Sequence, residues 1–200
     1  MRTVVGDGWL CLLAQQGAEL VRDFDHLLRA CRSRVRPCWN VFAIIESVDA
    51  GIWFGALSLS LMLPDVCASL ETPKAKNGER YRRWFKIWLQ PIYTINIPVI
   101  GEKVFFSAEN AWKLRNSFLH AGNGEVKQTA DALRRFHFTE PPGNGGIVHL
   151  NIINDVLQLQ VDKFCEEVVG AVKAWDASCS NNPEVQSRKT LLLGVHSIYN

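Results

Sequence analysis

The fold of this chain is decided by residues 50–64, which read AGIWFGALSLSLMLP and carry no charged side chain. They form the middle of a longer segment, Val41–Glu71, in which large apolar residues point to all sides of a helix. A helix that is apolar all round is usually buried among other helices. We therefore expect a central helical segment that is broken or kinked at Gly51 and Pro64.

Segments on both sides of this core follow the pattern of amphipathic helices. Apolar residues three or four positions apart predict helices over Trp9–Cys31, Gly78–Trp88, Ser107–Ala121 and Val161–Trp175. A run of arginines closes the first of them, and the run consists of Arg29, Arg32, Arg34 and Arg36. The expected fold class is therefore mainly all-α.

Residues 134–152 follow a different pattern. Arg135–Thr139 and Ile147–Ile152 each alternate polar and apolar residues, and residues 141–146 between them read PPGNGG, a strong turn signal. We expect a β-hairpin there, appended to the helices within a single domain of residues 1–176. Residues 177–200 are expected to form a C-terminal tail.

Composition limits the classes of protein that remain. The 200 residues suffice for one domain with a sizeable core, and the net charge of +2 is too small to indicate nucleic-acid binding by itself. The uncharged stretch is shorter than the roughly 20 residues that span a bilayer. The first residues lack a signal-peptide pattern, and the six cysteines form no CxxC pair. We expect a cytoplasmic protein with reduced cysteines, no membrane partner, no cofactor and no metal.

The best candidate for a chemical site lies at the end of the helix expected over Ser107–Ala121. Its last turns read Arg115-Asn116-Ser117-Phe118-Leu119-His120. Asn116 and His120 are four residues apart and share a face, while Arg115 points between that face and the core face. The shared face mixes aromatic, amide, imidazole and aliphatic groups, which suits a cleft or a subunit contact.

These residue types fit phosphodiester cleavage. Histidine transfers protons near neutral pH, and arginine offers a forked donor that binds phosphate oxygens and stabilises transition-state charge. Asparagine can orient either group. No metal is needed if a ribose 2′-hydroxyl is the nucleophile. The same pattern also fits a histidine at a helix end beside a solvated arginine.

This Arg-Asn-x-x-x-His segment, near the end of a late helix, resembles the HEPN superfamily. Ala56–Glu71 and Gly78–Trp84 are similar to the bacterial branch of that group, and the resemblance covers about residues 40–122. It implies a bundle of four to five helices and, commonly, a homodimer. Active members are metal-independent endoribonucleases that leave a 2′,3′-cyclic phosphate.

The resemblance also implies roles for single residues. By position, Arg115, Asn116 and His120 would form the catalytic group and meet their copies across the dimer interface. The first hypothesis is thus an endoribonuclease that acts on RNA, as a toxin or defence effector with an antitoxin protein as a further partner. Many HEPN proteins are not nucleases, so the alternative is a non-catalytic module that dimerises or binds a protein or nucleotide partner.

Other side chains are candidates for the same site. An RNA backbone can bind Arg80, Arg82, Arg83 and Lys86, although an amphipathic helix with a solvated basic side explains these residues equally. Tyr81 is either a packing residue or an accessory hydroxyl. Asp65 and Glu71 interrupt an apolar run, where a carboxylate near Arg115 would hold that arginine in place. The alternative for both carboxylates is a cap or an exposed edge.

Overall fold

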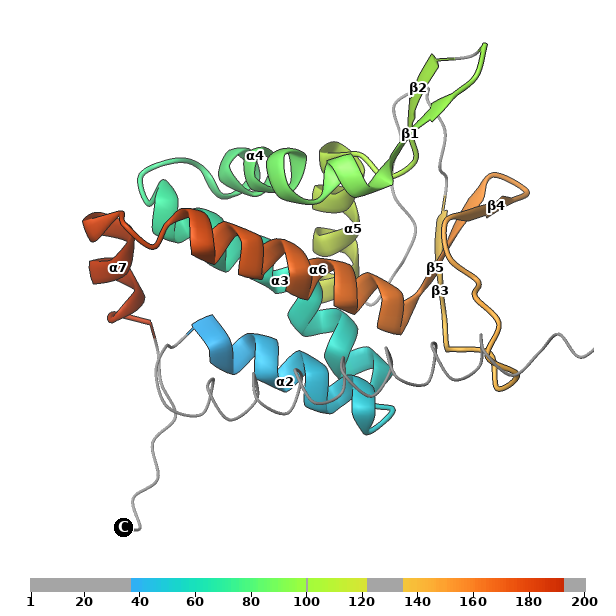
Figure 1. Ribbon diagram of the computed structural model, residues 1–200, viewed down its shortest axis with the longest axis horizontal. Helices are drawn as coiled ribbons and strands as arrows, with labels where there is room; N and C mark the ends of the chain where they lie inside the picture. The colour runs from blue at the N-terminus through green and yellow to red at the C-terminus, as the bar shows by residue number, and fades with distance from the viewer. Residues whose placement is uncertain (1–36, 100, 122–134, 193–200) are drawn as a thin grey trace, which may run out of the picture.

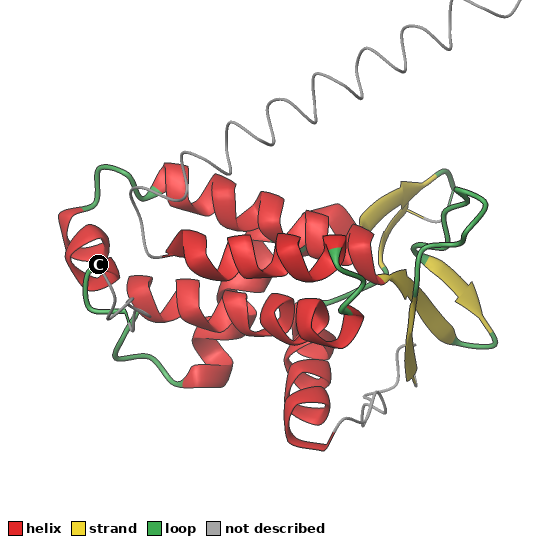
Figure 2. Ribbon diagram, turned by 90° about the horizontal axis from the view of Figure 1, so that it is seen from below, coloured by secondary structure: helices red, strands yellow, loops and turns green. Residues whose placement is uncertain are grey.

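The structure, a computed structural model, describes residues 37–99, 101–121 and 135–192. The helix expected over Trp9–Cys31 and the arginine run behind it lie outside these residues. Within them, the helices are α2 (Pro37–Asp49), α3 (Trp53–Glu71), α4 (Asn77–Trp88), η1 (Gln90–Tyr93), α5 (Ala108–Ala121), α6 (Val161–Ser178) and α7 (Pro183–Lys189). The prediction of a mainly helical fold is confirmed, and Figure 2 shows the strands gathered at one end of the helices.

Helix α3 is the centre of the bundle. Figure 1 shows α6 running beside it, with α4 on one side of the pair and α2 on the other. Gly51, with a φ of +68°, separates α2 from α3, as expected. Pro64 lies inside α3 and does not end the helix, so of the two expected outcomes at this residue, a break or a kink, the break is wrong. By length and mean hydropathy α3 would also pass as a membrane span, but half of that window is buried inside the bundle, as in a core helix.

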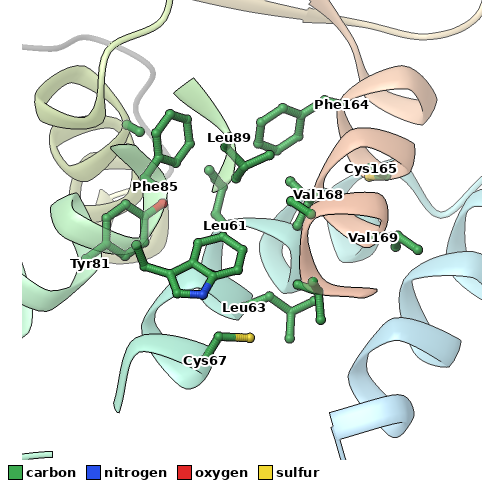
Figure 3. Packing of buried hydrophobic residues seen from close by; sticks show 14 of the residues in the cluster. Leu61, Leu63, Cys67, Tyr81, Phe85, Leu89, Phe164, Cys165, Val168 and Val169 are labelled. Carbon is green, nitrogen blue, oxygen red and sulfur yellow. The ribbon is translucent and has the colours of Figure 1, made fainter. Parts of the chain in front are cut away.

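The core forms where α3, α4 and α6 meet. Figure 3 shows Leu61 and Leu63 of α3 facing Tyr81 and Phe85 of α4 and Phe164, Val168 and Val169 of α6. The largest side chains in this core are aromatic and less than 2% exposed. They include Trp84, Trp175, Tyr81, Tyr93, Phe85, Phe106 and Phe164. Cys67, Cys165 and Cys179 are buried free thiols.

The β-hairpin expected over residues 134–152 is wrong in its pairing. Strand β3 (Arg135–Thr139) pairs in parallel with β5 (Val156–Gln160), and β4 (Asn151–Ile153) pairs antiparallel with β5. The sheet order is therefore β3-β5-β4, with β5 in the centre. The hairpin that does form joins β4 to β5 through Asn154 and Asp155, which both have positive φ.

A second, smaller sheet lies in a region for which no strand was predicted. Strands β1 (Thr94–Ile97) and β2 (Gly101–Val104) form an antiparallel ribbon between η1 and α5. Figure 1 shows this ribbon projecting from the body of the molecule, next to the end of α4.

The segment expected to be a C-terminal tail contains a packed helix. The Asn182 side chain caps α7 by accepting hydrogen bonds from the backbone N–H groups of Glu184 and Val185. Arg188 Nη1 donates to the Leu70 carbonyl at 2.6 Å, which fixes α7 against the end of α3. The folded body therefore continues beyond residue 176 to about residue 190.

Candidate functional site

The helix that carries the Arg-Asn-x-x-x-His segment has a well-defined start. Ser107 caps α5, as predicted: its Oγ accepts a hydrogen bond from Asn110 N at 3.2 Å. The Gln90 side chain of η1 accepts a second bond, from Ala108 N at 2.9 Å. These two bonds fix the position at which α5 leaves the ribbon, and hence the direction of its later residues.

One carboxylate, that of Asp65 on α3, joins three helices. Its Oδ1 accepts a hydrogen bond from Arg80 Nε on α4 at 3.1 Å, and its Oδ2 pairs with Arg115 Nη2 on α5 at 3.4 Å. The three side chains are between 15% and 19% exposed, so water and salt screen these pairs less than pairs on the open surface. Two guanidinium groups and one carboxylate carry a net charge of +1, which favours an anionic ligand.

Arg115 is oriented by further contacts on its own helix. Its Nη1 donates to Asn116 Oδ1 at 3.0 Å, and its guanidinium lies 5.4 Å from the centre of the Trp112 ring. Its Nε is buried and has no hydrogen-bond partner among the described residues. A guanidinium has five N–H donors, so each Nη group retains one donor for a ligand such as a phosphate.

Tyr81 and Gly78 of α4 complete the packing around Trp112. The Tyr81 ring lies 5.3 Å from the Trp112 ring, and its buried hydroxyl has no hydrogen-bond partner among the described residues. Burial raises the pKa of Tyr81 well above its ordinary value, an effect that the nearby Arg115 charge partly offsets. A Cβ on Gly78 would lie 3.0 Å from the Trp112 indole, so any larger residue there would require the indole to shift by a few tenths of an ångström.

The other candidate residues have different surroundings. His120 belongs to the last turn of α5, and its side chain lies outside the described part of the chain. Glu71 is directed at α6, where it accepts a hydrogen bond from Trp175 Nε1 at 2.9 Å. It therefore joins the α3–α6 contact and not the group around Arg115.

The basic residues of α4 divide into two groups. Arg80 pairs with Asp65, and Arg82 pairs with Glu109 in the first turn of α5 at 3.4 Å. Arg83 and Lys86 are exposed on the side of α4 that faces away from the buried Tyr81, Trp84 and Phe85. The expected RNA-binding set is thus split, because only Arg80 lies next to the Arg115 group.

Two exposed apolar side chains lie on the side of α3 that carries Asp65. Phe54 and Met62 of α3 are 66% and 43% exposed, and they lie on the same side of α3 as Asp65. The Phe54 ring packs 4.8 Å from the Phe118 ring of α5. An apolar surface with a charged group at its edge is typical of a protein contact.

Sequence reasoning did not find the Arg80–Asp65 pair or the role of Gly78. Both depend on how three helices meet, and the spacing of residues within one helix does not reveal them.

Among the described residues, no three His, Cys, Asp or Glu side chains lie close enough together to hold a metal ion. No protein-family model, curated protein or solved structure matches this chain.

Proposed function

We propose that this protein is a metal-independent endoribonuclease of the HEPN type. The observation that carries the proposal is the side chain of Arg115, which Asp65 and Asn116 hold in place at 3.4 Å and 3.0 Å while it stays partly accessible. An arginine fixed in this way is suited to phosphate charge that develops in a transition state, because no reorganisation is needed at that moment.

In the proposed reaction the ribose 2′-hydroxyl attacks the neighbouring phosphorus. His120, in the last turn of α5, acts as the acid or base that transfers the proton. Arg115 stabilises the phosphate oxygens, and Asn116 keeps the guanidinium in position. The 5′-oxygen leaves, and the products are a 2′,3′-cyclic phosphate and a free 5′-hydroxyl.

A homodimer is part of this proposal. The exposed Phe54 and Met62, on the side of α3 that carries Asp65, provide an apolar surface that a second copy would cover. That contact would bring two copies of α5 together. A cellular role as a toxin or defence effector, controlled by an antitoxin protein, is proposed on the same basis.

The deciding experiment is a gel assay of RNA cleavage in excess EDTA. We expect the parent protein to cleave mixed cellular RNA and His120→Ala to leave it intact while folding normally. His137→Ala is the matched control, because His137 is an exposed residue of β3 and its loss should leave cleavage unchanged. Equal cleavage by parent and His120→Ala would contradict the assignment.

The second candidate function is a binding module with the same fold and no turnover. The observation in its favour is that both guanidinium ends of Arg115 already contact groups of the same chain. This function predicts unchanged RNA and a stable complex with a partner. Phe54→Asp would then disrupt the complex, and light scattering would show the change in mass.

A further inference from the structure

Exposed apolar side chains concentrate on one short segment outside the Arg115 group. Of the twelve large apolar side chains that are exposed in the described part of the chain, five lie between Ile87 and Val104. They are Ile87, Ile92, Ile95, Val99 and Val104. Single exposed apolar residues are normal, but a cluster marks a contact surface for a protein or a membrane.

The two faces of the β1–β2 ribbon differ in composition. Paired residues point to the same side, so Ile95 and Ile97 share one face with Lys103, and Thr94, Asn96, Glu102 and Val104 share the other. Tyr93, the last residue of η1 directly before the ribbon, is fully buried in the core, whereas Ile95 is 43% exposed. The chain thus passes from the core into solvent within the first residues of the ribbon, and an isolated two-stranded ribbon gains little stability.

The tip of the ribbon carries an apolar side chain without cover. Val99 is fully exposed to solvent, and its φ is +73°. Branched residues rarely adopt this left-handed conformation. The valine therefore contributes nothing to the packing of its own chain, and the side chain is available to another surface.

A basic strip leads to this ribbon along α4. Lys76, Arg83 and Lys86 are exposed on one face of the helix, with Glu79 as the single acidic residue among them. Ile87 lies on the same face and is 52% exposed. Figure 1 shows the ribbon projecting beyond the end of α4.

We infer that the outer face of α4 and the β1–β2 ribbon form a docking surface for an anionic phospholipid membrane. Val99 and Ile95 enter the boundary between headgroups and acyl chains, as apolar faces of peripheral proteins do. Arg83, Lys86 and Lys103 lie against the negative headgroups. Docking of this kind needs no spanning segment, so the short uncharged stretches of the sequence do not argue against it.

The chemistry of the surface favours lipid over RNA. The five exposed apolar side chains are all aliphatic, whereas single-stranded RNA is held by aromatic side chains that stack on its bases. A phosphate backbone would attract the lysines but would leave Val99 and Ile95 in water. A membrane surface provides both the negative charge and the apolar layer. This inference does not depend on RNA cleavage.

Vesicle sedimentation with the full chain tests the inference. The probes are vesicles of phosphatidylcholine alone and of phosphatidylcholine mixed with phosphatidylglycerol. We expect binding only to the mixed vesicles, with binding weakened by added salt. Val99→Asp should lower the bound fraction about tenfold, because it removes one inserted apolar side chain and adds a repelled charge.

Matched variants distinguish the loss of this docking surface from the general effect of a changed charge elsewhere on the protein. Leu191→Asp changes a side chain that is 80% exposed, beyond α7 at the other end of the helices, and should bind like the parent. Lys86→Glu should weaken vesicle binding, whereas Lys173→Glu, an exposed residue of α6, should not. Thermal unfolding by circular dichroism confirms that each variant is folded.

Two results would overturn the inference: the absence of binding to mixed vesicles, and equal binding by the parent and Val99→Asp. If no vesicle is bound, weaker RNA binding by Lys86→Glu would assign the surface to RNA, and a changed oligomeric state of Val99→Asp would assign it to a second copy of the chain.

Discussion

Asp65 is the residue on which the arrangement of Arg115 depends. Its carboxylate is 17% exposed and pairs with Arg80 and Arg115 from two other helices. We expect Asp65→Asn to lower the free energy of unfolding by about 1–3 kcal/mol, because two partly buried guanidinium groups lose their anionic partner. If the proposed enzyme is active, RNA cleavage should fall more than stability does, since Arg115 would lose its fixed position.

Urea unfolding followed by tryptophan fluorescence measures this change, and Glu109→Gln is the control. Glu109 also contacts two basic residues, Arg82 and Lys113, but it is 48% exposed. Its loss should change the free energy of unfolding by about 0.5 kcal/mol or less, as for other surface pairs. Equal losses in the two variants would show that Asp65 has no special part in holding Arg115.

At the scale of elements, the approach of α4 to α5 depends on the absence of a side chain at position 78. The three atoms nearest to a Cβ there belong to the Trp112 indole, at 3.0–3.1 Å. Glycine to alanine inside a helix normally stabilises a protein by up to about 1 kcal/mol. Gly78→Ala should instead be neutral or destabilising, because Trp112 and with it the Arg115 contact must move.

Gly170→Ala in α6 is the matched test of this argument. Nothing lies within 4 Å of a Cβ at that position, and the residue is exposed on a long helix. We expect the melting temperature to rise for Gly170→Ala and to stay equal or fall for Gly78→Ala. A rise of the same size in both variants would mean that Trp112 moves freely at this contact.

The helices and strands also show which parts of the fold could be predicted from sequence patterns. Periods of three and four residues predicted α4, α5 and α6 closely, and Ser107 fixed the start of α5 through its side-chain chemistry. The predicted pairing of β3 was wrong because its partner is Val156–Gln160, a segment outside the predicted hairpin that alternates like a strand. Pairing of distant segments depends on the core beneath them, where Leu157 and Leu159 are fully buried.

In the candidate site, too, a contact between neighbours in the chain could be predicted from the sequence, whereas contacts between helices could not. Arg115 and Asn116 are neighbours in the chain, so their contact was within reach of sequence reasoning. The choice between Asp65 and Glu71 was not, because both interrupt one apolar run. The two carboxylates point in different directions on α3. Asp65 contacts Arg115 because α5 packs on its side of the helix, and Glu71 contacts Trp175 because α6 packs on the other side.

At the scale of the whole molecule, the helical end and the strand end differ in what they expose. The helices bury their aromatic residues between α3, α4 and α6, whereas the β1–β2 ribbon exposes Ile95, Val99 and Val104 to solvent. The Asp65–Arg115 pair lies within the helical end, and Val99 lies at the tip of the strand end. The two proposed surfaces are therefore separable by mutation.

The buried core also makes the free energy of unfolding depend on pH in the alkaline range. Five buried groups retain their protons in the folded state: Cys67, Cys165, Cys179, Tyr81 and Tyr93. Burial raises the pKa of each above its ordinary value, 9.0 for the thiols and 10.0 for the phenols, and the pKa of Cys165 reaches about 11. The unfolded chain releases these protons at the ordinary values.

Above about pH 9 the unfolded state therefore binds fewer protons than the folded state, and the free energy of unfolding falls as the pH rises. Each group contributes at most about 1.4 kcal/mol per pH unit between its unfolded and folded pKa. Urea unfolding measured from about pH 8 to about pH 10.5 should show this fall, with a shallower slope for Cys67→Ala because one of the five protons is removed. A free energy of unfolding that stays constant over this range would mean that the thiols and phenols reach solvent in the folded protein.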